Sequence, residues 1–183
     1  MKNIFKSLMI VVLFVGLGSS AFAQVSSTIN STATVQTSLT ITTPTEGTDD
    51  LVFGTVAQGV NASIDASTGV TTNCGTTAHL GKFTVTAQPE ATIWVSFAYT
   101  NLTGPGDELV FTPKVFRTAK TTDTYGTDEI TPGGEEYTVN KATTGDGTEN
   151  GVDHFFVGGT IVIKSDQTVG DYAGTITMTV AYN

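Results

Sequence analysis

The residue types that most often carry enzyme chemistry are scarce in this chain of 183 residues. His79 and His154 are the only histidines, and neither stands in the spacing of a metal site or a catalytic triad. The sequence contains no nucleophile elbow, phosphate-binding glycine loop or HExxH motif. A hydrolase needs such groups, so we predict that the protein is not an enzyme and holds no cofactor, zinc or iron.

One loop carries the oxygen ligands that a calcium ion prefers. Asp146, Thr148 and Asn150 alternate before Gly151, as in the first half of a helix-flanked calcium loop. The twelfth position of such a loop needs a bidentate Glu, whereas this chain has Val157 there. We therefore interpret the segment as an acidic, glycine-rich hairpin loop that binds no metal, with calcium binding as the alternative.

The last fourteen residues alternate between an apolar and a polar set, which is typical of a strand with one apolar face. The apolar set occupies the even positions Gly170, Tyr172, Gly174, Ile176, Met178, Val180 and Tyr182. Such a strand needs a neighbour, supplied either by this domain or by another chain that adds a strand at the sheet edge. We predict that Ile176, Met178 and Val180 are buried. The threonines at 175, 177 and 179 should then lie on the opposite face of the strand.

The N-terminus predicts export. Lys2 and Lys6 precede an apolar run over residues 8–17, and Ala21-Phe22-Ala23 forms a small-x-small cleavage site. Residues 1–23 therefore indicate a signal peptide that is cut before Gln24. The run is too short for a stable membrane span, so we expect an exported protein without a transmembrane segment, in the periplasm, at the cell surface or outside the cell.

Length and charge limit the remaining classes. Residues 24–183 suit a single domain with a real core. The formal net charge is −9, and loss of Lys2 and Lys6 makes the exported chain two charges more negative, which argues against a nucleic-acid partner. Cys74 is the only cysteine, so an intramolecular disulfide is impossible. We interpret it as a small buried residue, with a disulfide between chains as the alternative.

The chain after the signal peptide lacks helical periodicity and predicts an all-β fold. Turn signals separate nine candidate strands at residues 28–41, 51–56, 60–66, 80–87, 92–99, 109–117, 137–140, 155–164 and 173–182. Short strands at this spacing favour an antiparallel β-sandwich with Greek-key connections. The expected core comprises Phe53, Val56, Phe83, Val85, Ile93, Val95, Phe97, Phe111, Val157, Ile161, Ile163, Ile176, Met178 and Val180. Trp94 has the opposite parity to its neighbours and is expected outside that core.

An ordered set of motifs resembles a known family. The motifs are Leu-Val-Phe-Gly at 51–54, Gly-Lys-Phe-Thr-Val-Thr at 81–86, Phe-Val-Gly-Gly at 156–159, and the stretch from Gln167 to Tyr182. Together they resemble the bacterial secreted domain-of-unknown-function family numbered 4402. That family is similar to spore-coat-U and chaperone–usher pilin domains, which implies an incomplete immunoglobulin-like sandwich assembled by donor-strand exchange.

The C-terminus adds to the pilin resemblance. Pilin subunits typically end with a penultimate aromatic residue and a glycine fourteen residues from the end, positions held here by Tyr182 and Gly170. The resemblance implies that the strand from Gly170 to Tyr182 contacts a periplasmic chaperone and then neighbouring subunits. The alternative is a complete sandwich that happens to end in a strand.

The segment after the cleavage site is a candidate donor strand. Val25, Ile29, Ala33 and Val35 all occupy odd positions, so residues 24–35 could present one apolar edge to a neighbouring subunit. The same residues could instead form the domain's own first strand.

These observations predict an exported, non-catalytic subunit of a fimbria-like or surface-coat assembly, with a structural or adhesive role and with copies of itself or sibling subunits as partners. The alternative is a monomeric surface module that binds carbohydrate or calcium. In that case Trp94, the tyrosines and the loop over residues 146–153 are the candidate contacts.

Overall fold

A computed structural model describes residues 33, 36, 38–42, 49–118, 125–138 and 151–183. Residues 36–183 form one compact unit, and the fold is described within it. Ten strands lie within its described residues: β1 (Thr40–Thr42), β2 (Ala62–Ile64), β3 (Thr71–Thr72), β4 (Gly81–Thr86), β5 (Thr92–Tyr99), β6 (Val110–Thr118), β7 (Asp128–Ile130), β8 (Glu135–Thr138), β9 (Val152–Val162) and β10 (Ile176–Tyr182). The described residues contain no helix, and every strand pairing is antiparallel. The predicted all-β class is therefore confirmed.

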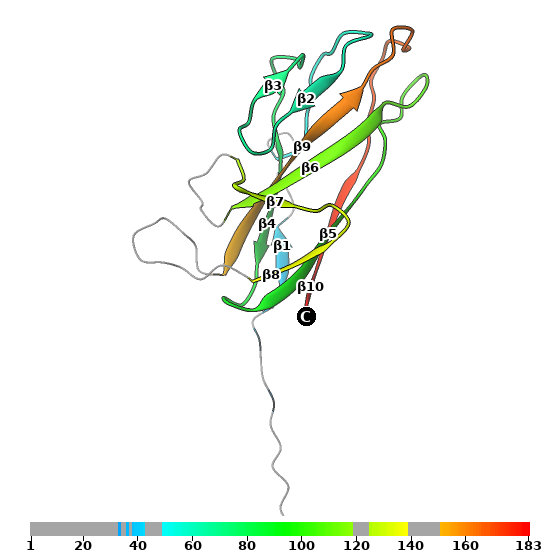
Figure 1. The fold of residues 1–183 in the computed structure, drawn as a ribbon. Coiled ribbons are helices and arrows are strands. Elements are labelled where there is room, and N and C mark those ends of the chain that lie inside the picture. The colour runs from blue at the N-terminus through cyan, green and yellow to red at the C-terminus, as the bar shows by residue number, and fades with distance from the viewer. Residues whose placement is uncertain (1–32, 34–35, 37, 43–48, 119–124, 139–150) are drawn as a thin grey trace, which may run out of the picture. The chain divides into compact units, whose positions relative to one another are not determined.

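The strands form two sheets (Figure 1). In the larger sheet, β9 pairs along its length with β6, and β6 pairs with β7. The other side of β9 pairs first with β4 and then with β2, and β1 and β3 lie beyond them. The smaller sheet has the order β10-β5-β8. Two packed antiparallel sheets make a β-sandwich.

Two glycines allow β9 to change partners. Gly158 and Gly159 lie where its pairing passes from β4 to β2. Gly159 has φ +140°, and a Cβ there would collide with the Thr112 carbonyl oxygen. A Cβ at Gly158 would collide with the Ile64 carbonyl oxygen. A glycine pair inside a strand is typical of such a close backbone contact.

The core consists of two apolar clusters. The first includes Ile93, Val95, Phe155 and Met178, and the second includes Phe53, Phe111 and Ile161. Most of the predicted core residues are buried. Four are only half-buried. Val56, Ile176 and Val180 lie on β10 or line a cavity described below, and the fourth is Phe83. The predicted core is thus incompletely covered mainly along one side of the sandwich.

Several strand predictions need correction. Residues 51–56 form no strand and contribute only an isolated bridge between Val52 and His79. Gly54 has φ +69° and packs against Gly75, which turns the backbone away from a regular ladder. Of the strand predicted over 28–41, only Thr40 and Ile41 are described as strand, and most of its earlier part lies outside the described residues. The short strands β3 and β7 carry no apolar alternation and were not predicted.

Candidate functional site

Strand β10 lies at an edge of the smaller sheet. It pairs with β5 from Ile176 opposite Tyr99 to Tyr182 opposite Ile93. Two further hydrogen bonds join Ala173 and Thr103, so the pairing extends to the residues before β10. No described strand pairs with the opposite edge of β10. An edge of this kind can template another strand.

The alternating side chains of β10 lie as the sequence predicts, but their burial is incomplete. Met178 is buried in the first cluster, with 7% of its surface exposed. Ile176, Val180 and Tyr182 are half-buried and pack against the same cluster. The intervening threonines at 175, 177 and 179 are exposed on the opposite face. The apolar face of the terminal strand is therefore covered fully at only one residue.

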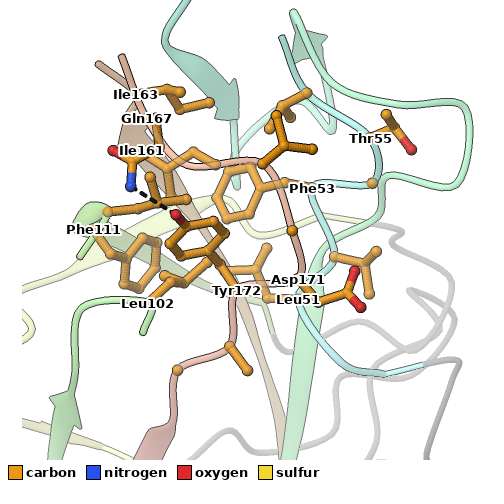
Figure 2. Close-up of a pocket in the computed structure, with 18 of the residues that line it drawn as sticks. Leu51, Phe53, Thr55, Leu102, Phe111, Ile161, Ile163, Gln167, Asp171 and Tyr172 are labelled. Carbon is orange, nitrogen blue, oxygen red and sulfur yellow. Dashed lines mark hydrogen bonds between the residues drawn. The ribbon is translucent and has the colours of Figure 1, made fainter. Parts of the chain in front are cut away.

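A cavity of about 600 Å³ adjoins the first residues of this strand (Figure 2). Residues 51–56 line one part of it and residues 167–176 line another. Apolar residues of the second cluster supply much of the lining: Phe53, Leu102, Leu109, Phe111, Ile161 and Ile163. The volume lies in the range of ligand-binding clefts, and the apolar part of the lining suits apolar side chains.

Aromatic contacts hold the cavity lining in place. The rings of Phe53 and Phe111 pack edge to face with centroids 6.2 Å apart, and Tyr99 packs on Phe111 at 6.0 Å. Figure 2 shows Phe53, Phe111 and Tyr172 gathered close together in the lining. Ile176 packs against both core clusters, so the cavity joins the apolar face of β10 without a break.

A polar network fixes the segment that leads into β10. Gln167 is 4% exposed, and its Nε2 donates to the Tyr172 hydroxyl at 2.9 Å and also to the Asp107 carbonyl oxygen. The Tyr172 hydroxyl donates to the Thr168 carbonyl oxygen at 2.8 Å. Lys164 Nζ lies 2.7 Å from a carboxylate oxygen of Asp107, and this hydrogen bond lowers the pKa of Asp107. The wall of the cavity is thus held independently of any occupant.

The two residues that carry the pilin resemblance lie at opposite ends of this edge. Gly170 precedes β10 and lines the cavity with φ +154°, and a Cβ there would lie 2.6 Å from the ring of Pro105. Tyr182 ends β10, and its hydroxyl accepts a hydrogen bond from the Gln88 backbone N–H at 2.8 Å. Packing against Pro105 explains why position 170 needs glycine.

The predicted donor segment is described at one residue only. Ala33 is exposed and belongs to no strand, whereas Val25, Ile29 and Val35 lie outside the described residues. Leu39, directly before β1, and Ile41, within β1, share their odd parity and pack against the first cluster. Residues 24–39 therefore precede the domain's own first strand.

The other sequence candidates do not gather into a site. The calcium candidates Asp146, Thr148 and Asn150 lie outside the described residues. Within the described part of the chain, no three His, Cys, Asp or Glu side chains are placed to hold a metal ion. Cys74 is half-buried, its thiol donates to the carbonyl oxygens of Ser63 and Thr72, and burial raises its pKa. The described residues also include no helix long and apolar enough to cross a membrane.

The described residues form a β-sandwich with an open strand edge and an adjoining cavity. Comparison with family models identifies the family of the chain. Residues 39–182 match the family described as a domain of unknown function, DUF4402, and the chain belongs to that family. The match begins directly before β1 and ends at the last residue of β10, so the predicted donor segment lies outside it. No curated protein and no solved structure matched the chain.

Proposed function

We propose that the protein is an exported, non-catalytic subunit of a surface assembly, and that subunits join by adding a β-strand to the open edge of β10. The observation that carries this proposal is the coincidence of that edge with a cavity whose lining is partly apolar. A strand laid along β10 would satisfy the backbone groups of the edge, and its alternate side chains would fill the cavity and cover the half-buried residues.

The strand order supports an immunoglobulin-like sandwich that lacks its last strand. In such a fold, strands ABED form one sheet and CFG the other. With β1, β4, β5, β6, β9 and β10 taken as A to F, the sheets have the orders ABED and CF, extended by β8 beside C. Strand G would pair with the open edge of β10, where the described residues provide none. A pilin-like subunit has this vacancy, and a periplasmic chaperone would occupy the same edge before assembly.

The best candidate for the missing strand is the N-terminal segment of another copy. Residues 24–42 contain no glycine, proline or charged residue and are rich in Thr, Val and Ile, a composition that favours extended structure. An uncharged donor also avoids repulsion by an acceptor whose net charge, without Lys2 and Lys6, is −11. Residues 24–35 would span about 40 Å when extended, which is about the length of the edge over residues 170–182.

A peptide-binding experiment tests the proposal. The acceptor is residues 36–183, the compact unit without the donor, and the probe is a synthetic peptide of residues 24–38. We expect saturable binding by calorimetry and a raised melting temperature, because the peptide binds only the folded acceptor. Ile29→Asp in the peptide should abolish binding, since it places a carboxylate on the apolar side of the donor.

Asn30→Asp is the matched control, because it adds the same charge to the neighbouring residue on the other side of the strand. It should bind nearly as well as the unchanged peptide. The proposal fails if the acceptor is monomeric and binds none of the peptides, or if both Asp peptides lose affinity equally. A self-complete sandwich acting as a monomer would then be the better account.

A further inference from the structure

The only tryptophan of the chain lies on the outer face of the smaller sheet. Trp94 is 41% exposed, and its side chain points away from the core because Ile93 and Val95 on either side are fully buried. It is flanked in register by Ala181 on β10 and Glu136 on β8. Trp94 therefore presents a large ring with an apolar body and a polar N–H group on the outer face of the sheet.

The backbone beside Trp94 positions its ring. A Cβ at Gly134 would collide with the indole, so the ring rests directly on this glycine. Gly134 is held in a turn by the hydrogen bond from its N–H to the Thr131 carbonyl oxygen at 3.1 Å. The Pro132 carbonyl oxygen of the same turn accepts from the Phe97 N–H at 3.0 Å, which ties the turn to β5. The indole therefore packs on the turn that directly precedes β8.

The other side chains on this face of the sheet are small and mostly polar. Along β5, Ser96 and Ala98 follow Trp94 on the same side, and their partners on β10 are Thr179 and Thr177. These side chains are small, so the indole stands above a flat surface with hydroxyl groups. At the end of the face, Asn183 Nδ2 donates to Glu136 Oε1 at 2.7 Å. A carboxylate on β8 and an amide directly after β10 thus lie together on this face, and each can make further hydrogen bonds.

The chemistry of this face selects a class of ligand. Strands β5, β8 and β10 contain no Lys or Arg, so nothing on them would attract an anionic ligand such as a phosphate or a nucleic acid. The neighbours of Trp94 are Ala, Ser, Thr and Glu, so the indole is the only large apolar group among small and polar side chains on this face of these three strands. A ligand with one apolar face and a rim of hydroxyl groups fits both the indole and its polar neighbours.

We propose that this face binds a neutral polysaccharide in extended conformation. One sugar ring stacks its C–H face on Trp94, and its hydroxyls donate to Glu136 and accept from the Asn183 amide. The next sugars lie along the flat ladder of Ser96, Ala98 and the threonines of β10. The face is separate from the edge of β10, so glycan binding does not depend on strand addition.

The single tryptophan makes the test specific. Cellohexaose and chitohexaose, two neutral β-1,4-linked oligosaccharides, are titrated into the full chain while its Trp fluorescence is recorded. We expect a saturable blue shift with at least one of them, because stacking removes water from the indole. Binding to the matching insoluble polysaccharide, cellulose or chitin, should weaken at least tenfold in Trp94→Ala.

Two further variants separate the site from general surface effects. Tyr125→Ala removes an aromatic side chain of nearly equal exposure, 42%, outside these three strands, and should bind as the unchanged protein does. Ala181→Arg keeps the fluorescent reporter but sets a guanidinium beside the indole, where it can cover the ring, and should abolish the blue shift. The proposal is overturned if neither oligosaccharide shifts the fluorescence, or if Trp94→Ala binds the insoluble polysaccharide as well as the unchanged protein does. It is also overturned if the shift depends on the protein concentration and not on the glycan concentration.

Discussion

Replacing Met178 by Asp is the most direct test of the packing of the terminal strand. The Met178 side chain is 7% exposed, lies opposite Phe97 on β5 and belongs to the first core cluster. Removing its apolar surface from the core costs about 2 kcal/mol. Burying a carboxyl group with no partner adds about 2 kcal/mol more, even when the group is protonated. We therefore expect a loss of about 4 kcal/mol, a large part of the 5–15 kcal/mol that stabilises a typical domain.

Urea unfolding followed by circular dichroism measures this loss in residues 36–183. Thr177→Asp is the control, because Thr177 is the preceding residue of β10 and its exposed side chain lies on the other face. A charge there should change the free energy of unfolding by less than about 0.5 kcal/mol. If both variants lose the same stability, or if Met178→Asp loses less than about 1 kcal/mol, the terminal strand does not pack as described.

Three further outcomes follow from individual contacts. Gly159→Ala should destabilise the domain by more than about 1 kcal/mol in urea unfolding, because the added methyl group meets the Thr112 carbonyl oxygen at a φ that favours glycine. Lys164→Ala should raise the pKa of Asp107 towards its ordinary value, as followed by NMR titration. Because the pKa of Asp107 is lowered, this pair stabilises the fold at pH values above the ordinary carboxyl pKa, and the stabilisation disappears as the pH falls through the lowered pKa. Both side chains are exposed, so the effect on stability should be small. Cys74 should react with a thiol reagent at pH 8 far more slowly in the folded protein than in urea, since burial raises its pKa and its thiol is hydrogen-bonded.

The sequence predicted the fold where one face of a strand is buried and the other is not. Residues 92–99 and 173–182 alternate for that reason: β5 has the predicted bounds, and β10 begins at Ile176 and ends at Tyr182 as predicted. The pattern misled at residues 51–56. Leu51 and Phe53 are apolar because they line a cavity and pack on the core, not because they pair in a ladder. Apolar composition alone does not distinguish these two causes.

The candidate site was only partly predictable. Alternation on β10 indicated an apolar face that needs a neighbour, and the structure adds that this face is incompletely covered. The cavity could not be predicted, because its lining brings together segments as distant as Phe53, Phe111 and Ile161. Gln167 gave no signal either, since a single glutamine after a strand shows nothing of the carbonyl and hydroxyl groups that it joins.

Amide hydrogen exchange is the most direct measurement of strand addition at β10. Residues 36–183 are exchanged in deuterated buffer with and without the peptide of residues 24–38. Addition of a strand to this edge predicts slower exchange in residues 176–181, together with the cavity wall over 169–175, while the edge strands β3 and β7 stay unchanged. Slowing at another edge, or no slowing at saturating peptide, would contradict the account.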